Sequence, residues 1–419
     1  MTPALTPTLA AWLHDLDPVA LRLGPATIYW YGISYVLGFA LAYLLLRVAA
    51  GRGLTPIPGA AIGDLVLFGG IGGVVGGRVG YLVLYQPSLL GEFSGGFPYW
   101  AALDITRGGM ASHGGMVGAL LGLALLARLL RRRAAREDMP QLANLPTLHV
   151  VDLACAVAPV GLMCGRLANF VNGELLGRVA ARPPYEDGGG GPWWSVQFPQ
   201  EILARGDTGE VTDGQIRLAA EAVGMSDLEM IQPGGQERFI AAYTQLMADL
   251  RGGGPAAERA ANFFEGFLSA RHPSQLYQAA VEGPLLFLAL LIVWARPRVA
   301  GVVTAWFMIL YGLGRIATEF YRLPDSQFAV ARPMGLSRGQ WLSVALVVGG
   351  CGLLGVVVAR AGKKRRLGDS APRFGGWLAP AFRVAAPAPG VSAPAPSVSA
   401  PAKPGDAHGR PDADDDERQ

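Results

Sequence analysis

Residues 148–178 read LHVVDLACAVAPVGLMCGRLANFVNGELLGR, an apolar run that ends in a strongly polar segment. The apolar part and its first polar residues are long enough to cross a membrane as a helix, which needs about 20 mostly apolar residues. The polar end, at 165–178, carries two arginines, two asparagines and one glutamate. Because each of these groups is costly to bury without a partner, this end lies outside the membrane or faces a polar cavity within it.

The composition points to a membrane protein with several spanning helices. Of 419 residues, 51% are hydrophobic, only 16% are charged and 58 are glycines. Many small residues suit helices that pack closely inside a bilayer. Cys155, Cys164 and Cys351 lie far apart in apolar runs, so neither a disulfide framework nor a zinc-binding spacing is present.

Hydropathy predicts an all-α, polytopic integral membrane protein with seven transmembrane helices. The expected spans are 28–48, 60–85, 110–130, 148–170, 277–295, 299–320 and 340–360. The second and fourth spans are the least apolar, because they contain polar residues and many glycines.

The placement of Lys and Arg predicts the orientation of the spans. The short loops after the first, third, fifth and seventh spans are basic, as in RLLRRRAARED at 128–138 and KKRR at 363–366. Basic loops remain on the cytoplasmic side of a membrane, so we expect the N-terminus outside and the C-terminus inside.

This orientation divides the chain into five parts. They are an external N-terminal segment (1–27), helices one to four (28–178), an external connection (179–270), helices five to seven (271–366) and a cytoplasmic tail (367–419). Helical periodicity at 215–250 predicts a small helical cap, which we expect to be bounded by the linkers DGGGGP and RGGGP. The tail is rich in Pro, Ala and Ser and is expected to be disordered.

Polar residues from several spans are expected to meet at the depth of the outer leaflet. Tyr311, Arg315 and Glu319 follow one another at i, i+4 and i+8 and therefore share one helix face, and Arg166 and Asn169 share a face likewise. The other members of this set are Tyr31, Arg78, Tyr81, His113, Asn172, Glu174, Arg178, Arg271 and His272. Ionisable groups inside a membrane are functional candidates, so we predict a polar pocket shared by several helices.

Structural interpretations of the same residues remain open. Arg315 and Glu319 could neutralise each other at i, i+4, and Arg78 and Arg178 could extend toward lipid headgroups. His113 could be a structural group in its glycine-rich stretch. The run GGIGGVVGG at 69–77 is better explained by close helix packing than by phosphate binding, because it lacks the Lys-Ser/Thr of a P-loop.

Several arginines at this depth suit an anionic lipid headgroup as the ligand. A guanidinium group binds phosphate through two parallel hydrogen bonds and keeps its charge when it is partly desolvated. A nearby histidine could accept a proton near neutral pH. The sequence contains no nucleophile elbow and no metal-binding motif, so we expect neither a metal nor an organic cofactor. Physical reasoning alone leaves the reaction unnamed.

Five segments of the sequence resemble the bacterial prolipoprotein diacylglyceryl transferase family over roughly residues 28–360. In chain order they are GGRVGY, GGMASHGG, GRLANFVNGELLGR, RHPSQLY and YGLGRIATEFYRLPD. The resemblance implies a seven-helix enzyme of the bacterial inner membrane with its N-terminus and its active site on the periplasmic side and its C-terminus in the cytoplasm. Such an enzyme transfers diacylglyceryl from phosphatidylglycerol to the lipobox cysteine in a prolipoprotein signal peptide, and releases glycerol 1-phosphate.

The resemblance also implies roles for individual residues. Arg166 and Arg315 match essential arginines that would hold the phosphate, and His113 matches a histidine that could help to form the thiolate. The expected substrate-binding or pocket residues are Tyr31, Arg78, Asn169, Glu174, Gly177, Tyr311 and Glu319. Asp152 matches a family aspartate to which the sequence assigns no role.

The expected partners are phosphatidylglycerol, prolipoprotein signal peptides and membrane lipids, with no nucleic acid. The resemblance assigns no function to the insertion at about 205–262 or to the tail. The rival hypothesis is a membrane transporter or binding protein for anionic phospholipid headgroups. A transporter would carry polar residues through the inner half of the spans, where the sequence offers few besides Asp64 and Asp152.

Overall fold

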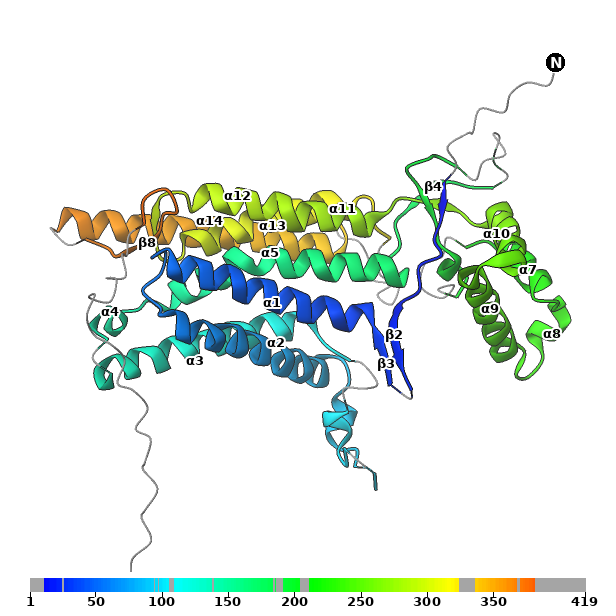
Figure 1. Ribbon diagram of the computed structural model, residues 1–419, viewed down its shortest axis with the longest axis horizontal. Helices are drawn as coiled ribbons and strands as arrows, with labels where there is room; N and C mark the ends of the chain where they lie inside the picture. Colours follow the sequence, from blue (N-terminus) through cyan, green and yellow to red (C-terminus); the bar gives the residue numbers. More distant parts are fainter. Residues whose placement is uncertain are drawn as a thin grey trace, which may run out of the picture. The chain divides into compact units, whose positions relative to one another are not determined.

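The computed structural model describes residues 11–24, 26–93, 95–96, 98–104, 109–137, 139–183, 185, 191–203, 211–323, 336–367 and 370–380. The described residues form a bundle of long helices and a smaller head (Figure 1). Most of the tail that was expected to be disordered, together with the linker residues 187–190, lies outside the described residues.

Each predicted span corresponds to a helix or a helix pair of the bundle. In chain order these are α1 (Trp30–Gly51), α2 (Ile62–Leu84), α3 (Ser112–Arg136), α5 (Thr147–Asn172), α11 (Ser274–Ala280) with α12 (Leu286–Val293), α13 (Val302–Glu319) and α14 (Arg338–Arg366). Among the described residues, six helical segments are long and apolar enough to cross a membrane. The sixth predicted span, α13, is not one of them, because Arg315 and Glu319 lower the mean hydropathy of its 18 residues.

Shorter helical elements connect these helices. They are η1 (Gly59–Ala61), η2 (Pro87–Leu90), η3 (Ala101–Leu103), α4 (Pro140–Ala143), η4 (Pro199–Glu201) and η5 (Val281–Leu285). The η5 element is a π-type turn that separates α11 from α12.

Glycines bring α2 and α3 into direct backbone contact. A Cβ atom added at Gly76 or Gly80 would lie within 2.7 Å of backbone atoms of the facing helix, and one at Gly72 would collide with the carbonyl of Gly118. Small residues allow this approach and the dispersion contacts that it creates. The interpretation of the GGIGGVVGG run as helix packing therefore holds.

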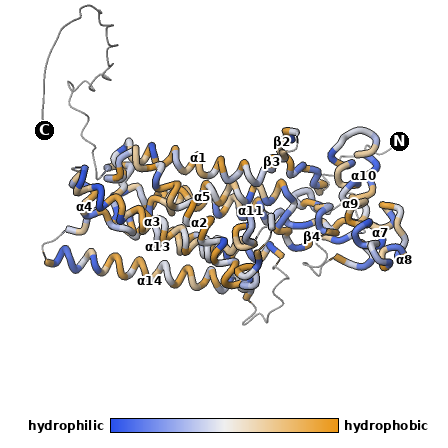
Figure 2. Tube along the Cα trace, turned by 90° about the horizontal axis from the view of Figure 1, so that it is seen from below, coloured by the Kyte–Doolittle hydropathy of each residue, from blue (hydrophilic) through white to orange (hydrophobic). Residues whose placement is uncertain are grey.

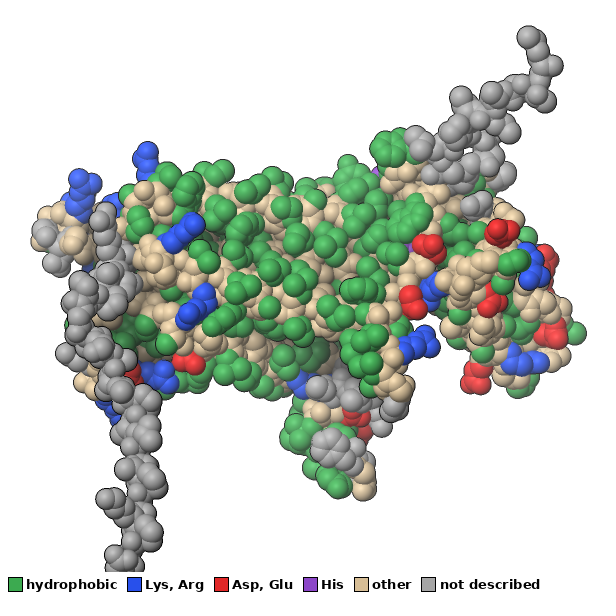
Figure 3. Space-filling model, viewed as in Figure 1, with side chains coloured by type: hydrophobic (Ala, Val, Ile, Leu, Met, Phe, Trp, Pro, Cys, Tyr) green, Lys and Arg blue, Asp and Glu red, His purple; other side chains and the backbone are tan. Residues whose placement is uncertain are grey.

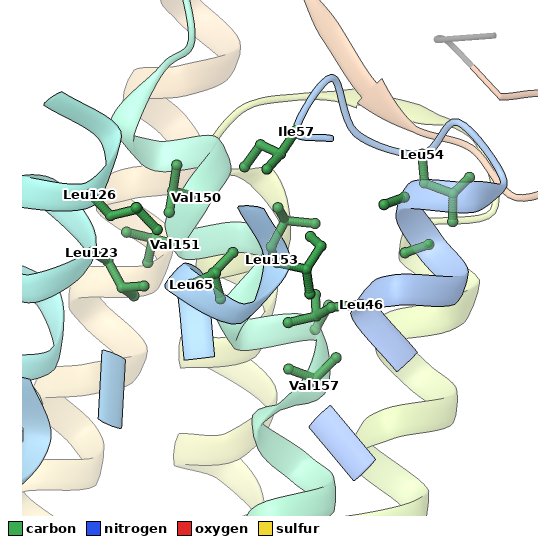
Figure 4. Packing of buried hydrophobic residues seen from close by; sticks show 14 of the residues in the cluster. Leu46, Leu54, Ile57, Leu65, Leu123, Leu126, Val150, Val151, Leu153 and Val157 are labelled. Atoms are coloured by element: carbon green, nitrogen blue, oxygen red, sulfur yellow. The ribbon is translucent and has the colours of Figure 1, made fainter. Parts of the chain in front are cut away.

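The apolar core of the bundle lies in the half farther from the head. Leu46, Leu65, Leu126 and Val150 are almost completely buried there, where they come from four different helices (Figure 4). The hydropathy of the chain follows the same division, with an apolar bundle and a more polar head (Figure 2). Polar groups in the half of the bundle nearer the head therefore lie outside this apolar core.

The head combines four helices with a small sheet. Its helices are α7 (Asp213–Ala222), α8 (Asp227–Ile231), α9 (Gly235–Gly252) and α10 (Gly254–Phe267). Its sheet has the strand order β1-β5-β6-β4, with β1 (Trp12–Leu13), β5 (Val196–Gln197), β6 (Ala270–Arg271) and β4 (Val179–Ala181). The RGGGP segment does not bound the head as expected, because it joins α9 to α10 within it.

A buried ion pair connects the sheet to the head helices. Arg271 on β6 and Glu201 at the end of η4 are both fully buried, and the Arg271 Nε donates to the Glu201 carboxylate. Glu201 also accepts hydrogen bonds from the Ser269 amide at 2.9 Å and from the Gln215 side chain on α7 at 3.3 Å. The sequence predicted that Arg271 belongs to the polar pocket. In the structure it instead stabilises the contact between the sheet and the helices of the head.

Two further strand pairs complete the fold. The strands β2 (Val19–Leu23) and β3 (Ala26–Tyr29) form a hairpin that precedes α1. At the other end of the bundle, β7 (Pro297–Val299) pairs with β8 (Arg373–Gly375). Residues 370–380, which we expected to belong to a disordered tail, are thus packed against the bundle.

Candidate functional site

Arg166 and Arg315 converge on one carboxylate, that of Glu282. The Nε of Arg166, near the end of α5, lies 2.9 Å from Glu282 Oε2, and the Nη1 of Arg315, on α13, lies 3.4 Å from Glu282 Oε1. The Glu282 side chain is completely buried, whereas each arginine side chain remains 16% exposed. The two arginines therefore share an internal anchor and still present donors to a ligand.

The turn η5 places Glu282 between the two helices. Gly283 departs from helical geometry (φ −96°, ψ −107°), and Pro284 follows it without an amide proton to donate. A Cβ atom at Gly283 would lie only 2.7 Å from the Cβ of Met163, so glycine allows α5 to approach this turn. Turns of the π type often occur inside helices at functional sites, where they redirect a side chain.

Two more groups of α13 extend the cluster. Glu319 lies 3.6 Å from Arg315 and 3.9 Å from Arg322, and it accepts a hydrogen bond from Ser337 at 3.3 Å. Tyr311 lies within electrostatic range of Arg166, Arg315 and Glu282. The stripe predicted from Tyr311, Arg315 and Glu319 therefore does face the interior of the bundle.

Arg315 is held less tightly than Arg166. The distances from Arg315 to its two carboxylate partners, 3.4 and 3.6 Å, exceed the roughly 2.7–2.9 Å of a strong charge-assisted hydrogen bond. Its guanidinium group can therefore turn toward an anionic ligand such as a phosphodiester.

A second polar group surrounds Glu174 at the same end of the bundle. Its carboxylate accepts hydrogen bonds from the side-chain amides of Asn169 at 3.1 Å and Asn172 at 3.2 Å. The backbone carbonyl of Glu174 accepts a hydrogen bond from Gln275. This polar sequence therefore folds back on itself and fixes an exposed carboxylate next to the end of α5.

Gly177 lies where three segments meet. A Cβ atom at this position would collide with the carbonyl of His272, and the Gly177 carbonyl accepts a hydrogen bond from Arg271 Nη1 at 3.0 Å. Gly177 also forms an isolated antiparallel bridge with Arg322. The residue thus has a structural reason to be glycine, namely close backbone packing.

His272, in the RHPSQLY segment, is enclosed by aromatic rings. Its ring centroid lies 4.8 Å from that of Trp194 and 5.1 Å from that of Tyr321, and its Nδ1 lies 3.4 Å from the hydroxyl of Tyr277. Burial lowers the pKa of His272, so its imidazole is neutral at pH 7.

Tyr31 and His113 lie outside the arginine–carboxylate cluster. Tyr31, at the start of α1, accepts a hydrogen bond from the hydroxyl of Tyr35 at 3.2 Å, and Tyr35 lies within electrostatic range of Glu174. His113 is half-buried at the start of α3. Within the described part of the chain it has no hydrogen-bond partner, so its ring is not committed to a structural contact.

Arg78 has a different environment from the one expected of a ligand-binding arginine. It is buried, and its guanidinium donates to the backbone carbonyls of Ala101, Ala102, Asp104 and Gly109 at 2.7–3.1 Å. These carbonyls belong to the segment between α2 and α3. The contacts point to a role in holding that connection rather than in snorkelling into headgroups.

The structure explains Asp64 and Asp152, the two acidic residues in the half of the bundle away from the head. Asp152 accepts hydrogen bonds from the amide of Gly301 and from the amide and hydroxyl of Thr304, at 2.6–2.7 Å. It therefore neutralises the N-terminus of α13, where unpaired amides and the helix dipole favour an anion. Asp64 forms a 3.2 Å ion pair with Arg133 on α3.

Glu282 is the main site residue that the sequence reasoning missed. It lies in the predicted fifth span, where a single acidic residue among apolar neighbours is itself a signal of function or pairing. Its partner helices are far away in sequence, and nothing in the sequence pattern identifies them.

The fold and this site define a polytopic helical membrane protein with a buried arginine–carboxylate cluster at the head end of its bundle. Residues 18–356 match the model of the family described as prolipoprotein diacylglyceryl transferase, and the chain belongs to this family. The resemblance noted in the sequence is thereby confirmed.

Three relatives illustrate the similarity. The phosphatidylglycerol–prolipoprotein diacylglyceryl transferase of Bdellovibrio bacteriovorus is 35% identical over 358 residues, which cover 83% of this chain and 94% of the relative. The proteins of the same name from Chromobacterium violaceum and Burkholderia multivorans are 34% and 33% identical, over 81% of this chain and 95% and 94% of the relatives.

Proposed function

We propose that this protein transfers the diacylglyceryl group of phosphatidylglycerol to the thiol of the lipobox cysteine in a prolipoprotein signal peptide. This reaction is the first step of bacterial lipoprotein maturation. The observation that carries the proposal is the convergence of Arg166 and Arg315 on Glu282, inside the segment that matches the family. The guanidinium groups of Arg166 and Arg315, each partly exposed, suit the negative charge of the phospholipid phosphodiester.

The proposed reaction is a direct displacement at the carbon of the diacylglyceryl group that carries the phosphate. The cysteine thiol loses its proton to a base, and the sulfur forms a C–S bond as the C–O bond to phosphate breaks. The electron pair of that bond leaves with the phosphate oxygen, so glycerol 1-phosphate departs with additional negative charge. Arg166 and Arg315 stabilise this charge where it develops.

His113 is the proposed base that accepts the thiol proton. It lies at the start of α3, is half-buried and has no hydrogen-bond partner among the described residues, so its ring is available for proton transfer. Tyr31, Asn169, Glu174, Tyr311 and Glu319 are proposed to position the two substrates, and Gly177 to keep the backbone around them close together. Arg78 is proposed to support the pocket through the connection that it holds.

We further propose that the head and the site face the periplasm and that the C-terminus is cytoplasmic. On the face shown in Figure 3, most Lys and Arg side chains of the bundle gather at the end opposite the head. Basic residues of this kind remain on the cytoplasmic side of the inner membrane. The lipid would then reach the site sideways between helices, and the peptide would approach from the periplasmic side.

The alternative, a transporter or binding protein for anionic headgroups, has less support. The half of the bundle away from the head is filled by the apolar core around Leu46, Leu126 and Val150. The acidic residues considered for a path across the membrane, Asp64 and Asp152, are each engaged in a structural contact.

The decisive experiment incubates the full-length protein with phosphatidylglycerol labelled in its acyl chains and a synthetic lipobox peptide. We expect the label to appear on the peptide in a thioether, and not on a matched peptide in which serine replaces the cysteine. Arg166→Ala should reduce the transfer by at least about 10²-fold, as expected for removal of a charge-stabilising donor. Binding of the lipid without transfer would favour the alternative function.

A further inference from the structure

A cavity lies at the end of the bundle opposite the head, far from the arginine–carboxylate cluster. It has a volume of about 630 Å³ and is bounded by α13, α14 and the β7–β8 pair. Cavities of about 300–1,000 Å³ are typical of small-molecule sites. The cavity also borders the last turns of α14, which end in the basic residues 363–366.

The walls and the rim of this cavity differ in chemistry. Trp306 on α13 and Leu354 and Val357 on α14 form an apolar wall. Three exposed arginines, Arg298, Arg365 and Arg373, line the same cavity. Among the described residues that line it, none is acidic.

The strand pair brings Arg373 to the cavity from the segment after α14. Arg373 lies opposite Val299 in the β7–β8 ladder and shares its face, whereas Arg298 lies opposite Phe374 on the other face. The ladder is anchored to α5, because the buried ring of Phe374 stacks on His149 at a centroid distance of 4.0 Å. Arg298 Nε also donates to the carbonyl of Val293 at 2.8 Å, which limits the movement of its side chain.

An apolar wall that continues into a cationic rim matches one ligand class, an amphiphile with an anionic head. Basic pockets between membrane helices bind the headgroups of anionic lipids. A free phosphate ion would satisfy the arginines but would leave the wall formed by Trp306 and Val357 without a partner. The membrane around these helices supplies the complete amphiphile.

We propose that this cavity binds one anionic phospholipid, with its phosphate against Arg365 and Arg373 and an acyl chain along Trp306 and Val357. On the proposed orientation this lipid belongs to the cytoplasmic leaflet. The site is separate from the transferase site, and β8 and the end of α14 lie beyond residue 356, where the family match ends. Bound lipid would hold the segment after α14 against the bundle.

The test uses the fluorescence of Trp306 in the full-length protein, reconstituted in phosphatidylcholine nanodiscs. Dibrominated phosphatidic acid is titrated in parallel with dibrominated phosphatidylcholine of the same chains, because bromine quenches a tryptophan only at contact. The Trp306 signal is isolated by subtracting the signal of a Trp306→Phe variant. We expect phosphatidic acid to be preferred by at least about tenfold, since one arginine near a membrane surface contributes roughly fivefold.

Matched variants locate the effect. Arg365→Glu with Arg373→Glu should abolish the preference, while Arg296→Glu with Arg366→Glu, which changes neighbouring exposed arginines outside the cavity lining, should retain it. Equal quenching by the two lipids, or the same loss in both double variants, would overturn the proposal. Suppression of the preference by added inorganic phosphate would identify a simple phosphate site instead and would also overturn it. Lipid transfer by the same variants is measured in separate nanodiscs that contain phosphatidylglycerol, so failure of either proposal is recognised separately.

Discussion

Arg166 and Glu282 form a 2.9 Å ion pair that connects the polar end of α5 to the interrupted helix α11–α12. The carboxylate is completely buried, so the pair is weakly screened by solvent. Arg315 contacts the other oxygen of the same carboxylate at a longer distance, 3.4 Å. Arg166 is therefore firmly positioned, whereas Arg315 can adjust. Arg315 can thus keep its contact with the phosphate as the bound lipid is converted to the leaving group.

The first prediction concerns Glu282, which orders the two arginines. Glu282→Gln keeps the size of the side chain but removes its charge, so the like-charged guanidinium groups should separate. Small displacements of groups that position a substrate cost roughly 10²-fold in rate, and we expect a loss of about this size in lipid transfer to the lipobox peptide. Asp64→Asn, which removes the partner of Arg133 at the other end of the bundle, is the control. Wild-type transfer by Glu282→Gln would show that the arginines need no shared anchor.

The second prediction tests whether Arg315 acts through the two-nitrogen geometry of its guanidinium group or only through its positive charge. Arg315 reaches Glu282 through Nη1 and Glu319 through Nη2, and a lysine ammonium cannot make both contacts in this geometry. One charge-assisted hydrogen bond contributes about 1.5–3 kcal/mol, so Arg315→Lys should reduce transfer by roughly 10- to 100-fold. Arg217→Lys, in an exposed ion pair with Asp227 in the head, should have no effect. Equal activity of Arg315→Lys and wild type would indicate simple charge attraction.

The third prediction concerns the N-terminus of α13. Asp152→Asn replaces a carboxylate that accepts three hydrogen bonds with an amide that retains one acceptor oxygen. We expect the free energy of unfolding to fall by about 2 kcal/mol, with unchanged transfer per folded molecule. Thr304→Val, which removes only the hydroxyl donor, should cost about 1 kcal/mol. Thermal unfolding in detergent measures both, and an equal loss in the two variants would contradict the proposed cap.

The fourth prediction is a pH dependence that arises at His14. This buried side chain lies 2.8 Å from the carbonyl of Phe170 through Nε2 and 3.2 Å from Gln200 Nε2 through Nδ1. A carbonyl only accepts, so Nε2 donates and Nδ1 accepts from Gln200. Burial lowers the pKa of His14 below its usual value of 6.5, because the charged form loses its solvation.

The sign of the effect follows from proton binding. Below pH 6.5 the unfolded chain binds a proton that the folded chain does not, so stability falls as the pH decreases toward the folded pKa. Above that range the contribution of His14 is constant. Unfolding temperatures measured from about pH 5 to about pH 8 should show a smaller acid-side decrease for His14→Gln than for wild type. An identical decrease would assign the effect to other groups.

The sequence determined the membrane character and much of the site. Runs of about 20 apolar residues have few alternatives to a spanning helix, because each backbone group must be hydrogen-bonded within the bilayer. The helical period likewise placed Tyr311, Arg315 and Glu319 on one face, and the structure directs that face inward. The glycine run at 69–77 predicted close helix packing, since only small residues allow such an approach, and the structure shows that the partner helix is α3.

Only the tertiary structure decided the partners of the buried polar groups. Glu282 meets Arg166 and Arg315, Asp152 meets the start of α13, and Arg78 meets a connecting segment whose carbonyls carry no sequence signal. The sheet of the head could not be foreseen either, because three of its four strands, β1, β5 and β6, are only two residues long. Local periodicity specifies which face of a helix is polar, whereas long-range packing selects the group that this face meets, and that selection depends on the simultaneous positions of all the helices.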